Sequence, residues 1–224
     1  MSVATHLGIE LKEYDQKIRT FVPHYETLLG VIANSLTLLD SAAPTVVDLG
    51  IGTGAVAQAC LAVCPDARII GVDADPGILD AARFRLSAHS NIEFRQADFL
   101  EVPLPPVDAM VACIALHHIA QPEEKQDFYR QALQVLRPGG ILVSGDCFPS
   151  IEPRLAARQR NAWLRHLEQT YTTAEAEGYL RAWSGEDVYF PLESELFWLR
   201  EAGFTAEVVW RTDGFAVVAG IRDR

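Results

Sequence analysis

The fold of this chain is decided at residues 46–54, Val46-Val47-Asp48-Leu49-Gly50-Ile51-Gly52-Thr53-Gly54. The apolar residues at the start predict a short strand, and glycines at alternate positions follow it. Because glycine has no Cβ, the backbone can turn sharply off the strand and bring its amides close to a ligand. Residues 55–64 then predict a helix whose N-terminus points at that ligand. The stretch therefore predicts a small-molecule site at the first turn from strand to helix.

An acidic residue follows at a spacing that suits a nucleoside. Asp73 stands nineteen residues after Gly54, at the end of a second apolar strand over 68–73. A carboxylate accepts from two hydroxyl donors at once, so Asp73 would select the cis-diol of a ribose. Gly50-x-Gly52-x-x-Ala55 also satisfies the dinucleotide fingerprint. These two motifs alone therefore fit either a dinucleotide or another nucleoside-bearing cofactor.

Apolar segments alternate with helical patterns along most of the chain. The expected strands cover residues 45–49, 68–73, 91–96, 107–113 and 140–146, and the expected helices cover 53–64, 76–88 and 122–136. Such alternation predicts a parallel sheet with right-handed crossovers and helices on both faces. Residues 204–210 and 215–221 flank Asp213-Gly214 and predict a terminal hairpin. We predict an α/β fold with a doubly wound, mostly parallel seven-stranded sheet and an antiparallel C-terminal hairpin.

Further helical segments surround this predicted sheet. Residues 23–40 form an amphipathic pattern near Pro23, and a helix is expected near 192–202. An extra, aromatic-rich stretch covers residues 148–190. At 224 residues, the chain is too short for two domains of ordinary size. We predict a single domain over 1–224, with an N-terminal helical cap at 1–42 and a helical lid insertion at 148–190.

Three later motifs distinguish between the possible cofactors. Gln96-Ala97-Asp98-Phe99 follows the third strand, residues 112–118 follow the fourth, and residues 136–143 lead into the fifth. In this order and spacing, the motifs resemble those of the class I S-adenosylmethionine-dependent methyltransferases. The resemblance implies a Rossmann-like methyltransferase fold and S-adenosylmethionine as the cofactor.

The resemblance also implies roles for individual residues. The three glycines of the turn would line the methionine part of the cofactor, and Asp48 would lie near its ammonium group or a bridging water, or else cap the turn. Asp73 would bind the ribose, and Asp98 the adenine amino group. The residues expected to bind the cofactor are Tyr14, Arg19, Asp48, Gly50, Gly52, Gly54, Asp73, Ala74, Asp98, Phe99 and Ile114.

A second, shorter pattern lies near the N-terminus. It reads Tyr14-Asp15-x-x-Ile18-Arg19-x-x-x-Pro23-x-Tyr25. This pattern is similar to one in methyltransferases near the tRNA wobble-uridine carboxymethylation pathway, whose members include a carboxy-S-adenosylmethionine synthase. The similarity implies that Tyr14, Arg19 and Tyr25 close over the cofactor.

His117 and His118 follow the fourth strand, where the resembled family often places residues near the transferred methyl group. A neutral imidazole, with an ordinary pKa of about 6.5, can take a proton from a hydroxyl or ammonium nucleophile. Only one of two adjacent side chains can face the pocket, and we predict His117 as the catalytic base. The alternative is that the pair only supports the loop.

The insertion at 148–190 predicts a wall for the acceptor, because aromatic side chains there would exclude water from the reacting groups. Arg154 and Arg158 are one helical turn apart and either bind an acidic group of the acceptor or form a solvated helix face. The residues expected to bind substrate are Tyr25, His118, Arg154, Trp183 and Tyr189.

The sequence predicts no metal site. Two adjacent histidines, His117 and His118, cannot both reach one ion easily. Cys60 and Cys64 share a helix but have no further ligands nearby in the sequence, so they are interpreted as buried thiols. No zinc and no disulfide are expected.

The composition limits the partners of the chain. Its net charge of −11 removes the electrostatic attraction that dominates nonspecific nucleic-acid binding. The first residues lack a basic segment followed by an apolar run, and no stretch is apolar enough for a membrane span. We expect a cytoplasmic protein with a small-molecule substrate, no nucleic acid and no membrane partner. Whether it forms a homodimer is left open.

The sequence thus predicts a methyltransferase that acts on an oxygen or nitrogen atom of a small molecule. One alternative is carboxy-S-adenosylmethionine synthesis, in which the cofactor itself is the acceptor. Another is an NAD-dependent dehydrogenase, which would need a proton relay that the sequence does not show. A third, from another class, is a catalytically silent partner subunit that binds S-adenosylmethionine.

Overall fold

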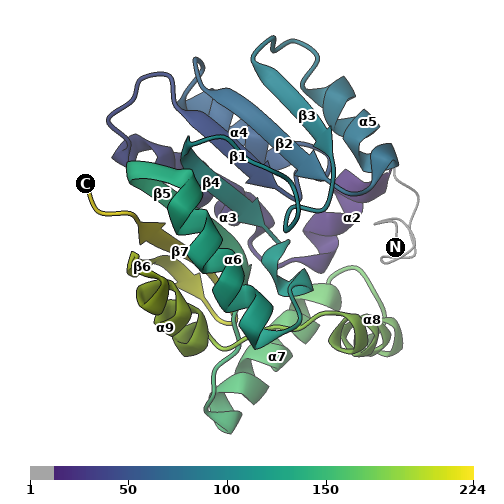
Figure 1. The fold of residues 1–224 in the computed structure, drawn as a ribbon. Coiled ribbons are helices and arrows are strands. Elements are labelled where there is room, and N and C mark those ends of the chain that lie inside the picture. Colours follow the sequence, from purple (N-terminus) through teal and green to yellow (C-terminus); the bar gives the residue numbers. More distant parts are fainter. Residues whose placement is uncertain (1–12) are drawn as a thin grey trace.

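The computed structural model describes residues 13–224 and is built around a seven-stranded sheet (Figure 1). The strand order is β3-β2-β1-β4-β5-β7-β6. The strands are β1 (Thr45–Leu49), β2 (Arg68–Asp73), β3 (Ile92–Gln96), β4 (Val107–Cys113), β5 (Leu136–Cys147), β6 (Thr205–Thr212) and β7 (Phe215–Ile221). The first five strands pair in parallel, and β7 pairs antiparallel with both β5 and β6. The predicted fold class is confirmed.

Helices cover both faces of this sheet. They are α2 (Tyr14–Phe21), α3 (Tyr25–Asn34), α4 (Ala55–Val63), α5 (Pro76–Arg85), α6 (Pro122–Val135), α7 (Pro153–Leu167), α8 (Thr173–Glu186) and α9 (Leu192–Ala202), with short 3-10 turns η2 (Ser35–Leu38) and η3 (Leu116–His118). One buried cluster joins the sheet to α3, α4 and α5, and a second joins its other face to α6 and α9. No helix in the described part of the chain is both long and apolar enough to cross a bilayer.

Most element limits agree with the sequence within a few residues, but the N-terminal segment differs. The helix expected over 23–40 is present as α3 and continues into the 3-10 turn η2, while His24, with a left-handed φ of 60°, separates α3 from α2. The helix α2 was not foreseen as a separate element. The part of the predicted cap at residues 1–12 lies outside the described residues. The fifth strand also begins earlier than expected, at Leu136, directly after α6.

The helices α2, α7 and α8 gather at one end of the sheet (Figure 1). Aromatic side chains join them: the ring centroids of Phe21 and Trp183 lie 5.3 Å apart, and those of Trp163 and Trp183 are stacked at 5.5 Å. The indole N–H of Trp163 donates to the Phe21 carbonyl oxygen at 2.7 Å. Helix α8 begins with a capping box, in which Thr172 and Glu175 satisfy each other's backbone N–H groups. Packing and caps thus fix the position of these helices over the sheet end.

Candidate active site

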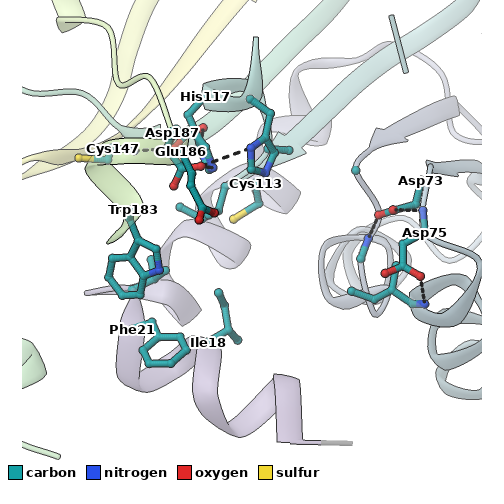
Figure 2. A pocket seen from close by; sticks show the side chains of 18 of the residues that line it. Ile18, Phe21, Asp73, Asp75, Cys113, His117, Cys147, Trp183, Glu186 and Asp187 are labelled. Carbon is teal, nitrogen blue, oxygen red and sulfur yellow. Dashed lines mark hydrogen bonds and ion pairs between the residues drawn. The ribbon is translucent and has the colours of Figure 1, made fainter. Parts of the chain in front are cut away.

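A cavity of about 560 Å³ lies beyond the carboxyl ends of the parallel strands. Strand order reverses between β1 and β4, and crevices at such reversals are the usual ligand sites of open α/β sheets. In Figure 2, Asp73 and Asp75 lie at one end of the cavity, and His117, Asp187 and Trp183 lie at the other. The cavity therefore has two ends with different side chains.

The glycine-rich turn and Asp73 form the first end. Gly52 has a φ of +55°, and a Cβ built there would have no heavy atom nearer than 3.9 Å. That spacing is ordinary van der Waals contact, so glycine is favoured here by its positive φ, and Gly52 lines the cavity with its backbone. The Asp73 carboxylate accepts from the backbone N–H groups of Gly52 and Asp75, each at 3.0 Å. Each oxygen keeps a second acceptor site, so the carboxylate can still bind two hydroxyl groups.

Other predicted cofactor residues line the same cavity. They are Tyr14, Gly50, Ala74, Asp98, Phe99 and Ile114. Ile114 has a φ of +51°, a conformation that costs a non-glycine residue about 1–3 kcal/mol and that often marks a functional loop. Its backbone N–H donates to the Gly145 carbonyl oxygen at 2.8 Å, which holds the turn after β4 in place.

Asp15 explains why the N-terminal pattern belongs at this site. Its carboxylate accepts from the Thr53 hydroxyl at 2.7 Å and forms an ion pair with Arg85. Arg85 also donates to the Thr53 hydroxyl at 2.9 Å. These contacts dock α2 directly onto the glycine-rich turn and place Tyr14 at the cavity. No role of its own was predicted for Asp15.

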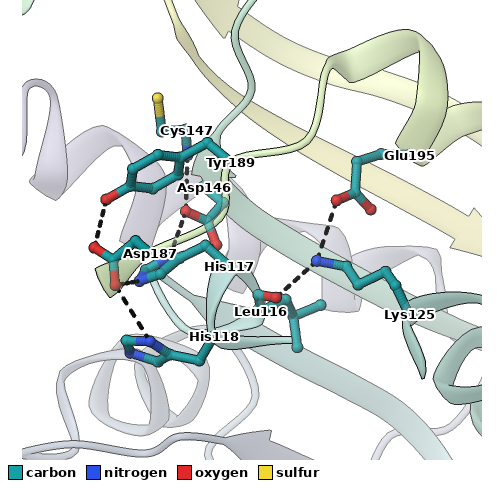
Figure 3. A network of polar contacts seen from close by, with 9 residues as sticks. All are labelled: Leu116, His117, His118, Lys125, Asp146, Cys147, Asp187, Tyr189 and Glu195. Atoms are coloured by element: carbon teal, nitrogen blue, oxygen red, sulfur yellow. Dashed lines mark hydrogen bonds and ion pairs between the residues drawn. The ribbon is translucent and has the colours of Figure 1, made fainter. Parts of the chain in front are cut away.

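His117 and Asp146 form the centre of the second end. The Nδ1 atom of His117 lies 2.9 Å from Oδ1 of Asp146, and both side chains are buried (Figure 3). Because an ionised carboxylate only accepts, Nδ1 carries the proton and Nε2 of the neutral ring has the lone pair. Burial alone would lower the pKa of His117, but the charges of Asp146 and Asp187 outweigh it and raise the pKa above the ordinary value. Burial alone would raise the pKa of Asp146, but the charge and hydrogen bond of His117 lower it below its ordinary value.

Asp187 joins this pair from the end of α8. Its Oδ1 lies 3.7 Å from Nε2 of His117 and 3.4 Å from Nδ1 of His118. The Tyr189 hydroxyl donates to the other carboxylate oxygen at 2.8 Å. One donor atom from each of His117, His118 and Asp187 lies within 4.8 Å of the other two. Both adjacent histidines therefore converge on one carboxylate, and the expected absence of a metal stays a prediction.

A buried ion pair supports the histidine turn from behind. Lys125 and Glu195 are both 2% exposed, and their charged atoms lie 3.1 Å apart. The Lys125 ammonium also donates to the Leu116 carbonyl oxygen at 2.7 Å (Figure 3). The Tyr129 hydroxyl donates to Glu195. These contacts join α6, α9 and η3. They also hold Leu116, the residue before His117, through the Lys125 ammonium.

The structure does not bring every predicted residue to the cavity. Arg19 is exposed and pairs with Glu26, and Arg154 is exposed on α7. Tyr25 is buried but does not line the cavity, and neither does Gly54. The predicted substrate residues His118, Trp183 and Tyr189 do line it.

Asp48 is likewise absent from the cavity lining. It is 1% exposed, and neither carboxylate oxygen has a hydrogen-bond partner among the described residues. Burial raises its pKa to about 7. The structure therefore places a costly buried acid beneath the glycine-rich turn, at a position that the sequence pattern assigned to the cofactor.

Two residues of the second end were missed. The sequence analysis placed Asp146 only within the strand expected over 140–146, and it did not consider Asp187. A signal for Asp146 was present, since it ends the strand next to the one that precedes His117. Asp187 gave no comparable signal, because only the packing of α8 brings it to the histidines.

Comparisons with known proteins agree with this architecture. A family model described as a methyltransferase domain matches residues 46–140. The carboxy-S-adenosyl-L-methionine synthase of Helicobacter hepaticus is 29% identical over 213 residues, which cover 92% of this chain and 89% of that protein.

Two solved structures share the fold. Human N-acetylserotonin methyltransferase in complex with SAM has a TM-score of 0.68 at 17% identity, covering 99% of this chain and 58% of that one. The apo S-adenosylmethionine-dependent methyltransferase SibL has a TM-score of 0.59 at 21% identity, covering 85% of this chain and 55% of that one. This chain thus spans little more than half of either solved chain. The matched domain, the relatives and the fold together support a class I S-adenosylmethionine-dependent methyltransferase.

Proposed function

We propose that this enzyme transfers the methyl group of S-adenosylmethionine to an oxygen or nitrogen atom of a small acceptor bound in the same cavity. One observation carries the proposal: a single cavity joins the glycine-rich turn and Asp73 to a buried histidine whose Nδ1 faces a carboxylate. The volume of about 560 Å³ is that of an ordinary small-molecule site.

The residues of the first end fit the cofactor. The backbone of Gly52 at the cavity wall and the two remaining acceptor positions of Asp73 suit a nucleoside that approaches the turn with its ribose diol on the carboxylate. Asp98 would meet the adenine, and Tyr14 would close the site from α2. When bound, S-adenosylmethionine supplies an electrophilic methyl group, so that a carbon–oxygen or carbon–nitrogen bond forms as the carbon–sulfur bond breaks.

The residues of the second end would position and deprotonate the acceptor. Nε2 of His117 accepts the proton that the acceptor loses, and the Asp146 carboxylate stabilises the imidazolium that results. The acceptor would lie against His118, Trp183 and Tyr189, with α7 and α8 as a lid that excludes water.

Calorimetry and a product assay test the proposal in two steps. Titration with S-adenosylmethionine and S-adenosylhomocysteine should give saturable heat with one site per chain. A panel of hydroxyl and amine metabolites should then give S-adenosylhomocysteine in the presence of one class of acceptor. Absence of heat with both nucleosides on folded protein would refute the cofactor site. Tight binding without turnover on any acceptor would favour a catalytically silent partner subunit.

Carboxy-S-adenosylmethionine synthesis is the second candidate, and the Helicobacter hepaticus relative favours it. The cavity charge opposes it. The described lining residues include six carboxylates, Asp73, Asp75, Asp98, Asp146, Glu186 and Asp187, and contain no lysine or arginine. The added carboxylate of the carboxylated cofactor would be repelled by such a lining. Mass spectrometry of the nucleoside retained on purification decides between the two, because only this candidate predicts a carboxylated form.

A further inference from the structure

The donor atoms at the second end of the cavity have the composition of a metal site. Two imidazoles and one carboxylate come from His117, His118 and Asp187 (Figure 3). Histidine and carboxylate donors suit first-row divalent ions, and three protein ligands are the usual number where a fourth position stays open. All three residues line the cavity, so that position would face it.

The distances fit a single ion. Ligands at about 2.0–2.1 Å from a tetrahedral ion lie about 3.3–3.4 Å from one another. Oδ1 of Asp187 is 3.4 Å from Nδ1 of His118 and 3.7 Å from Nε2 of His117. Small rotations of the side chains would therefore bring the donors into the coordination sphere of one ion.

The surrounding contacts hold the donors in the orientation that a metal needs. A metal-binding histidine commonly gives its other ring N–H to a carboxylate, and His117 faces Asp146 in this way. The Tyr189 hydroxyl orients Asp187. The backbone N–H of Val188 donates to the His117 carbonyl oxygen at 3.2 Å, which ties the two donor segments together.

The local charge also favours a cation. Asp146 is buried beside the three donors, and Glu186 lines the same cavity. Among the described lining residues, no lysine or arginine side chain opposes them. Lys125 lies behind the histidine turn, where it is paired with Glu195. The charge that a divalent ion brings would thus be balanced by carboxylates.

We propose that His117, His118 and Asp187 bind one divalent transition-metal ion, such as Zn²⁺ or Co²⁺. The ion would take the Nε2 lone pair of His117. Because the proposed function uses that lone pair to accept a proton, ion binding and base action exclude each other. The ion-bound enzyme would therefore be the inhibited form, and removal of the ion would restore methyl transfer.

Calorimetric titration of the purified full chain with Zn²⁺ and Co²⁺ tests the site without any acceptor. We expect one ion per chain, and Co²⁺ should develop visible absorption bands as solvent ligands are replaced by nitrogen donors. His118→Ala and Asp187→Asn should each abolish the bands. Tyr189→Phe removes only an orienting hydrogen bond and should weaken binding by about 10- to 100-fold. The matched control is His89→Ala, an exposed histidine that should leave the affinity unchanged.

The outcomes separate this inference from the proposed function. Protein that binds S-adenosylhomocysteine but neither ion would overturn the metal site alone. Equal ion affinity of the wild type and His118→Ala would also overturn it, provided that circular dichroism shows both to be folded. Ion binding without nucleoside binding would instead refute the proposed function. With an acceptor from the panel, faster turnover on adding Zn²⁺ would overturn the inhibitory role.

Discussion

The two ends of the cavity are built differently. The first end, which we call the cofactor end after the function proposed for it, consists largely of backbone groups in one turn, together with carboxylates that each follow a strand. The second end, which we likewise call the acceptor end, combines side chains from η3, β5 and the end of α8, with Lys125 and Glu195 behind them. The first end depends on local conformation, and the second depends on the packing of distant segments. Mutations should therefore affect them in different ways.

The largest effect is expected at His117. His117→Ala should lower the rate of S-adenosylhomocysteine release by about 10²- to 10⁴-fold, because it removes the proposed base. Its affinity for S-adenosylhomocysteine should stay close to wild type. Asp146→Asn should also slow the reaction, since an amide stabilises the imidazolium less. A variant of His117 with full activity on the same acceptor would show that the acceptor end only supports the loop.

Glu195 tests whether buried charge holds the acceptor end together. Glu195→Ala leaves the Lys125 ammonium buried and uncompensated, and should lower the free energy of unfolding by about 3–5 kcal/mol. Urea unfolding measures this loss. The matched control is the double variant Lys125→Met with Glu195→Leu, which removes both charges and should lose less. A smaller loss for the single variant than for the double one would contradict this explanation.

Asp48, beneath the glycine-rich turn, should make the free energy of unfolding depend on pH. Its pKa is raised from 3.8 to about 7 by burial, so the folded state binds a proton more tightly than the unfolded state. Stability contributed by this group falls as pH rises from about 4 to about 7 and is constant above that range. Asp48→Asn should remove this slope and, at pH 8, stabilise the fold by up to roughly 4 kcal/mol. An unchanged slope in chemical unfolding across this range would be evidence against the buried acid.

Asp73 tests the cofactor end directly. Asp73→Ala should weaken S-adenosylmethionine binding by roughly 1.5–3 kcal/mol, about 10- to 150-fold, the size expected for hydrogen bonds to a charged group. Calorimetry measures the change. Asp80→Ala on the exposed face of α5 is the control and should bind normally. Equal S-adenosylmethionine affinities of Asp73→Ala and Asp80→Ala would show that Asp73 does not bind the ribose.

Arg154 is expected to have the smallest effect. It is exposed on α7 and does not line the cavity, so Arg154→Ala should change neither acceptor KM nor stability by more than about 0.5 kcal/mol. Steady-state kinetics with the identified acceptor checks this. A large rise in KM would mean that the lid moves far enough to bring α7 to the acceptor.

Several residues that the sequence assigned to the cofactor line one cavity, because they follow strands and turns locally in the chain. A strand, a glycine turn and an acid at the end of the next strand must meet at one edge of a parallel sheet, whatever packs around them. His117 was found for the same reason, since it follows β4. Asp48 shows where this reasoning stops, because the same strand periodicity does not tell whether a carboxylate turns toward the ligand or into the core.

What the sequence determined by itself is the α/β fold, the cofactor class and the strand ends where the site lies, since strand and turn preferences act over a few residues. Only the tertiary structure decided that Asp146 and Asp187 meet His117, that Asp15 docks α2 on the turn, and that Arg19 and Arg154 stay in solvent. The physical reason is that these contacts join segments far apart in the chain. Their formation depends on how helices pack over the sheet end, which no local pattern encodes.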